Sequence, residues 1–124
     1  MVVANLSFTI PLETAPQVHF ITVGGKGGGP GTGCPTTSEV TKPEAEPGNL
    51  CIFAAEMVNA NYVAGGLPQI NSPEVVIGAG GGTSGKTGAL MLVAPEFILN
   101  SQGEPEGFKS GPVGALGTWA VTAE

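Results

Sequence analysis

The chain has 124 residues, of which 41% are hydrophobic and 11% charged, so it is long enough for one folded domain and too apolar for a disordered segment. A net charge of −6 argues against nucleic acid and anionic membranes as partners, because both select clustered Lys and Arg, and this chain has four lysines and no arginine. No apolar run approaches the roughly 20 residues that a membrane-spanning helix needs.

The first half of the chain predicts two strands and then a long loop. Leu6–Ile10 alternates apolar and polar residues, which is typical of a half-buried strand. Gln17–Val23 is rich in β-branched and aromatic residues and is followed by two glycines. Residues 24–48 are mostly Gly, Pro, Thr and Glu with almost no apolar residue, which predicts a Gly/Pro-rich surface excursion.

The second half predicts four further strands, at Asn49–Met57, Glu74–Ala79, Thr87–Ala94 and Gly117–Thr122. Turn signals lie between them, and no stretch of about 12 residues shows a clean helical period. The pattern therefore predicts an all-β fold, a compact antiparallel sandwich or jelly-roll-like domain with long Gly/Pro loops, in which residues 1–124 form a single domain.

The two cysteines predict a disulfide. Cys34 lies in the Gly-rich excursion and Cys51 in the strand that follows, and an even cysteine count in a small, loop-rich domain favours pairing over two reduced thiols. Closing this loop would stabilise the fold by about 3 kcal/mol. A zinc site is not expected, since two thiols and the single distant His19 do not supply four ligands, and the lack of aspartate excludes Asp-based calcium loops.

Residues 80–87 match the phosphate-binding pattern G-x-x-x-x-G-K-[ST] through Gly80, Gly85, Lys86 and Thr87. In such a site the lysine reaches the terminal phosphates and the threonine holds magnesium. Three features oppose this interpretation: a short apolar run rather than a helix follows the loop, and the chain has neither an aspartate to support the metal nor an arginine. Nucleotide binding is therefore the weaker alternative, and no cofactor is expected.

The remaining candidate side chains favour structural roles. His19 alternates with its strand neighbours as a surface or interface histidine would, and no Asp-supported triad or Gly-x-Ser-x-Gly elbow accompanies it. Phe8, Phe20, Phe53 and Trp119 are the expected anchors of a core or of a subunit interface. The chain is therefore predicted not to be an enzyme.

Several segments together resemble the C-terminal globular head that follows collagen-like Gly-x-y stalks in bacterial, largely actinobacterial, surface proteins. Pro-Gly-Asn-Leu-Cys and Thr-Trp-Ala-Val-Thr are the most specific of them. The resemblance spans nearly the whole chain and is carried by Leu6–Leu12, Val18–Phe20, Cys34–Pro35, Glu46–Phe53, Thr87–Leu90 and Gly117–Ala123.

The resemblance implies an exported protein with Cys34 and Cys51 paired, whose head caps and registers a three-chain stalk. The leading hypothesis is a non-catalytic, extracellular or cell-surface head, homotrimeric, that presents its loops to a carbohydrate or protein ligand the sequence leaves open. A virion component, such as a capsid decoration protein or a fibre tip, fits the same residues. No collagen-like segment occurs in the chain itself.

Overall fold

The computed structural model describes residues 2–29, 31–59, 69–71, 85–86, 88–93, 95 and 97–124. The regular elements in these ranges are all strands, as predicted, and no helix in them is long and apolar enough to cross a membrane. The strands are β1 (Val2–Ser7), β2 (Gln17–Ile21), β3 (Asn49–Val58), β4 (Gln69–Asn71), β5 (Gly88–Val93), β6 (Phe97–Leu99), β7 (Pro105–Phe108) and β8 (Gly114–Thr122).

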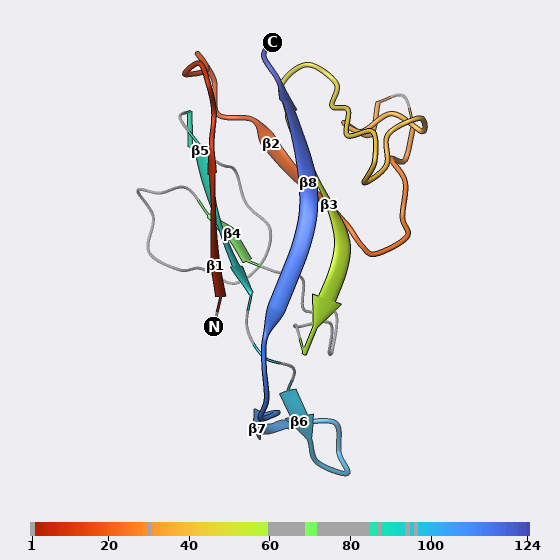
Figure 1. Ribbon diagram of the computed structural model, residues 1–124, viewed down its shortest axis with the longest axis vertical. Helices are drawn as coiled ribbons and strands as arrows, with labels where there is room; N and C mark the ends of the chain where they lie inside the picture. Colours follow the sequence, from red (N-terminus) through yellow and green to blue (C-terminus); the bar gives the residue numbers. More distant parts are fainter. Residues whose placement is uncertain are drawn as a thin grey trace.

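The strands form two three-stranded sheets and one hairpin (Figure 1). One sheet has the order β1-β5-β4 and the other β2-β3-β8, while β6 and β7 pair with each other at one end of the molecule. The all-β class is thereby confirmed. A jelly-roll order stays a prediction, because the connections through residues 60–68 and 72–84 lie outside the described ranges.

One strand pair departs from the antiparallel arrangement that the sequence predicts. β2 and β3 run parallel, with Gln17 opposite Asn49 and Ile21 opposite Phe53, whereas the other described pairs are antiparallel. Parallel neighbours need a crossover connection of about a dozen residues or more. The predicted excursion at 24–48 supplies that length, so the long loop and the parallel pair have one cause.

β3 is the central strand of its sheet, and its first half, through Ala54, is buried on both faces. Leu50 and Ile52 pack on one side against Leu6 and Phe8, from β1 and the segment after it. Cys51, on the alternate face, belongs to a second apolar cluster. Because both faces are covered, β3 reads as the nearly continuous apolar run Leu-Cys-Ile-Phe-Ala rather than as an alternation.

The excursion at 24–48 is more deeply buried than the surface loop that the sequence predicts. Gly27, Gly33, Cys34 and Ser38 are buried within it, and it covers the second face of the β2-β3-β8 sheet. The hydroxyls of two β8 threonines fix it there, as Thr122 donates to the carbonyl of Ala45 at 2.9 Å and Thr118 to that of Val40. A loop with few apolar side chains is thus held by backbone groups and by the apolar residues of the sheet itself.

Strand ends differ from the predictions where a pairing partner begins or ends. The predicted strand Leu6–Ile10 stops at Ser7, because Ser7 lies opposite Gly88, the first residue of β5. Ile10 is consequently 73% exposed. β2 ends two residues early, and β8 begins three residues earlier than expected, at Gly114. The predicted strand Glu74–Ala79 lies outside the described residues.

Three short strands were not predicted. β4 is only three residues long, and β6 lies between Pro95 and Pro105, a residue type that is rare inside strands. β7 begins at Pro105 itself, a position that a strand tolerates because a first residue need not donate to the ladder.

Candidate functional site

The predicted disulfide is present and ties the excursion to the central strand. Cys34 and Cys51 are bonded, their Cα atoms 6.1 Å apart, and both are almost completely buried. The bridge packs with Phe53 in the second apolar cluster, where Ile21 and Val40 flank it. Its role in the fold is therefore to hold the loop against the face of β3 that the other sheet does not reach.

His19 lies under this loop and contributes to its structure. Its Nε2 is 2.7 Å from Oδ1 of Asn49, a residue at the start of β3. Gly33 closes over the pair with φ of +91°, and a Cβ at that position would lie 2.3 Å from His19 Nε2. Only glycine fits there, both because of its φ and because of the close approach. The geometry supports a structural role for His19.

A carboxylate inside the loop accepts hydrogen bonds from backbone N–H groups next to the disulfide. Glu46 accepts from the N–H of Gly31 at 3.2 Å and from that of Gly33 at 3.0 Å. The backbone N–H of Glu46 in turn donates to the Gly33 carbonyl at 2.8 Å. These bonds make the segment around Cys34 a closed, hydrogen-bonded unit, which accounts for its order despite its glycine content.

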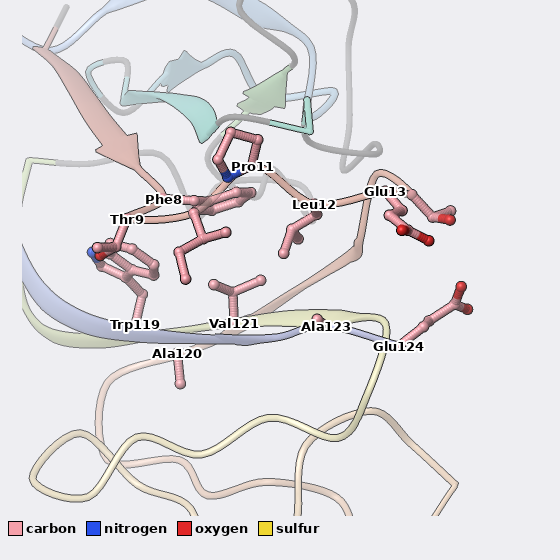
Figure 2. A pocket seen from close by; sticks show the side chains of 12 residues that line it. Phe8, Thr9, Pro11, Leu12, Glu13, Trp119, Ala120, Val121, Ala123 and Glu124 are labelled. Carbon is pink, nitrogen blue, oxygen red and sulfur yellow. The ribbon is translucent and has the colours of Figure 1, made fainter.

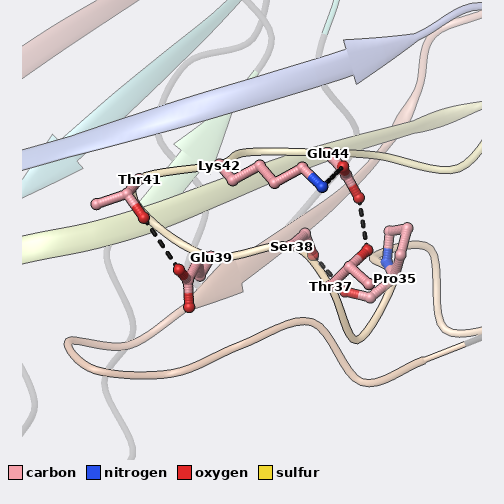
Figure 3. Close-up of polar contacts among 7 residues, drawn as sticks. All are labelled: Pro35, Thr37, Ser38, Glu39, Thr41, Lys42 and Glu44. Atoms are coloured by element: carbon pink, nitrogen blue, oxygen red, sulfur yellow. Dashed lines mark hydrogen bonds and ion pairs between the residues drawn. The ribbon is translucent and has the colours of Figure 1, made fainter.

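The outer rim of the loop carries a small network of charged and hydroxyl groups (Figure 3). Glu44 accepts from the Thr37 hydroxyl at 2.7 Å and pairs with Lys42 at 3.1 Å. The hydrogen bond from Thr37, and then the one from Lys42, lower the pKa of the Glu44 carboxyl below its ordinary value of 4.5. On the neighbouring turn Thr41 donates to Glu39 at 3.0 Å. The network is exposed and contributes little to stability.

The predicted phosphate loop falls largely outside the described residues, which include Gly85 and Lys86 but neither Gly80 nor Thr87. Directly after it the chain enters β5 at Gly88, and β5 is antiparallel to both of its neighbours. A phosphate-binding loop leads instead into a helix, whose first amide groups hold the phosphate. The strand at this position argues against the nucleotide-binding alternative.

The four predicted aromatic anchors occupy different environments. Phe53 is 1% exposed, in the second cluster, and Phe20 is half-buried against the first. Phe8 is buried, and its ring lies 5.8 Å from that of Trp119, tilted by 46°. Trp119 itself is 37% exposed. It is therefore partly available to a ligand or to another subunit.

Trp119 stands at one end of a groove of about 730 Å³, here called the β8 groove (Figure 2). Residues 8–14 line one side of it, and residues 119–121, 123 and 124 of β8 and its end line the other. Trp119 and Val121 project into the groove, whereas Ala120 points to the opposite face of the sheet. Glu13 and Glu124 lie together at the end away from Trp119. The groove is thus apolar along its length and acidic at one end.

Sequence reasoning identified Phe8 and Trp119 among the residues of this groove and missed the others. Residues 11–16 read as a turn, and no local pattern shows that this segment crosses in front of β8. Among the described residues, no group of three or more His, Cys, Asp or Glu side chains could hold a metal ion. The arrangement provides apolar contact, an aromatic surface and two carboxylates, which are means of binding.

Comparisons with protein-family models, with curated protein sequences and with solved structures gave no match to this chain.

Proposed function

We propose that this chain is a non-catalytic structural and recognition head that acts outside the cell and assembles with copies of itself, as a homotrimer at the end of a stalk or fibre. The observation that carries the proposal is a group of large apolar side chains left exposed at the hairpin end of the molecule. The number three comes from the resemblance to the heads of collagen-like surface proteins.

The exposed apolar residues at the hairpin end form what we call the distal patch. Leu116 of β8 is 62% exposed and Phe108 of β7 is 55% exposed. Ile98 and Leu99 of β6 and Val58 at the end of β3 are each at least 40% exposed. Figure 1 shows the end of β3 and the start of β8 on the side of the molecule where the β6–β7 hairpin lies. Exposed apolar side chains gathered at one end of a molecule mark a surface that another molecule covers.

The extracellular location is supported by the disulfide. A bridge such as Cys34–Cys51 forms and persists in oxidising compartments and is rare where cytosolic thiol systems operate. The low charge and the polar loops are compatible with that setting. A head of this kind needs rigidity rather than moving parts, and the stapled loop provides it.

The test is the mass of the protein in solution, measured by light scattering after size exclusion. A trimer has a mass of about 37 kDa, against 12.3 kDa for one chain. Leu116→Glu places a charge in the distal patch and is expected to shift the population to monomer. The matched control, Val23→Glu, also replaces an exposed apolar side chain with a carboxylate, at a residue just after β2 that is 51% exposed, and should leave the trimer intact. A wild-type protein that is monomeric at all concentrations contradicts the proposal.

A further inference from the structure

The β8 groove has an open strand edge along one side. In the part of the chain that the structure describes, β8 pairs with β3 alone. The carbonyl of Thr122 points toward β3, where it accepts from the N–H of Gly48 at 2.8 Å. Since peptide groups alternate in direction along a strand, those of Trp119, Val121 and Ala123 point to the free edge. An extended chain lying there would meet donors and acceptors in strand register.

The side chains at this edge offer apolar contact and then negative charge. Trp119 and Val121 project into the groove, and the Trp119 indole N–H has no acceptor within the described residues. At the far end no described residue forms a salt bridge or hydrogen bond with the side chain of Glu13 or Glu124. Five residue steps separate Trp119 from Glu124, which in an extended strand is about 17 Å. A ligand of five or six extended residues spans this distance.

From this geometry we propose that the β8 groove binds an extended peptide segment that adds to the edge of β8. Its inward side chains, at every second position, would be apolar, apolar and then Lys or Arg. The two apolar groups lie against Trp119 and Val121, and the cation lies between Glu13 and Glu124. This inference gives a ligand class to the recognition role proposed above and rests on that role.

The same pattern excludes a second copy of this chain as the occupant. The chain has four lysines and no arginine. The proposed pattern needs large apolar residues two and four positions away from the cation on the same side of it, and no lysine of this chain has them. A second copy also carries a net charge of −6, which opposes approach to an acidic site. The complementary charge therefore belongs to a different, basic partner.

The test uses synthetic peptides and the intrinsic fluorescence of Trp119, the only tryptophan in the chain. The peptide TVTVTKTG, acetylated at its N-terminus and amidated at its C-terminus, presents Val, Val and Lys on one face. It is expected to change the fluorescence with a Kd below about 1 mM. The control peptide TVTVKTTG moves the lysine to the other face and should bind more weakly. Equal responses to both peptides, or none to either, would overturn the proposal.

Two further comparisons distinguish strand addition from non-specific hydrophobic binding. In an extended peptide, alternate backbone N–H groups point to opposite sides, and N-methylation of every second nitrogen removes the donors on one side only. Strand addition predicts that one set abolishes binding while the other is tolerated, because only one faces β8. If both sets are tolerated, the peptide does not pair with the strand and the inference is wrong. Fluorescence quenching by a chito-oligosaccharide but by neither peptide would assign Trp119 to a sugar site and also refute it.

The acidic end is tested by substitution. Glu13→Gln and Glu124→Gln should each weaken binding of TVTVTKTG by about two- to five-fold, and the loss should shrink as NaCl rises from about 20 mM to about 200 mM. Glu104→Gln removes the same charge from the β6–β7 turn and serves as the matched control. Unchanged affinity in the Glu13 and Glu124 variants contradicts the placement of the cation. The mass measurement is independent, so a trimer that binds no peptide refutes this inference alone.

Discussion

Reduction of the Cys34–Cys51 disulfide should lower the free energy of unfolding by about 3 kcal/mol. The bridge joins residues 17 positions apart, and the loop-entropy relation gives about 3 kcal/mol for a closed loop of this size. With an unfolding entropy of about 2.1 cal/mol/K per residue, the same change lowers Tm by about 12 °C for 124 residues. The disulfide stabilises the protein by lowering the conformational entropy of the unfolded chain, and the hydrogen bonds of Glu46 in the native state do not substitute for that.

Urea unfolding at 25 °C, followed by Trp119 fluorescence with and without a phosphine reductant, measures this difference. The reduced protein should also show a larger m-value, because its unfolded chain is less compact. The double variant Cys34→Ala/Cys51→Ala is the control: it should resemble the reduced wild type and not respond to the reductant. A loss below about 1 kcal/mol on reduction would refute the assignment of the bridge as the main constraint on the 24–48 loop.

Three other changes test the packing and electrostatics of the loop and core. Gly33→Ala should lower the free energy of unfolding by more than about 2 kcal/mol. Gly103→Ala, also at positive φ but with open space around it, should lower it by about 1 kcal/mol. Equal losses of the two variants in thermal unfolding would show that the close approach at Gly33 is unimportant. Phe53→Ala should cost about 3–5 kcal/mol because its ring is 1% exposed, and Val23→Ala, at a half-exposed site, should stay within about 0.5 kcal/mol in the same urea titration. The lowered pKa of the Glu44 carboxyl means that its ionised form favours the folded state, so its contribution is present above pH 4.5 and is lost as pH falls through the lower folded-state pKa. The free energy of unfolding of Glu44→Gln, measured by urea titration, should therefore be slightly lower than that of the wild type at pH 7 and equal to it near pH 2. A difference between the two proteins that grows on acidification contradicts this sign.

The sequence was sufficient where structure follows from local pattern or covalent chemistry. The apolar run from Leu50 predicted β3, although it did not reveal which segments cover the two faces of the first half of that strand. The pairing of Cys34 with Cys51 followed from their number and from the composition of the loop between them. Thr87–Ala94 predicted β5 to within one residue at each end, because the apolar run lies between Gly88 and Pro95.

The remainder depends on contacts between distant segments. The parallel pairing of β2 with β3 leaves no local mark, since each strand has the same composition in either direction. The burial of Gly33 arises from His19 and Asn49 beneath it, which lie 14 residues earlier and 16 residues later in the chain. The acidic end of the β8 groove has the same origin, because Glu13 and Glu124 stand at opposite ends of the sequence.

The distal patch and the β8 groove favour different partners, and they lie at opposite ends of β8. Gly114 begins this strand, and the groove is lined by its other half, from Trp119 onward. Self-association of a chain with a net charge of −6 is favoured at a surface that carries apolar groups and opposed at one that carries two carboxylates. The proposed assembly through the distal patch would therefore leave the groove of each copy open. A trimer would present three such grooves at its far end, and a basic partner with repeated binding segments would gain avidity from engaging more than one of them.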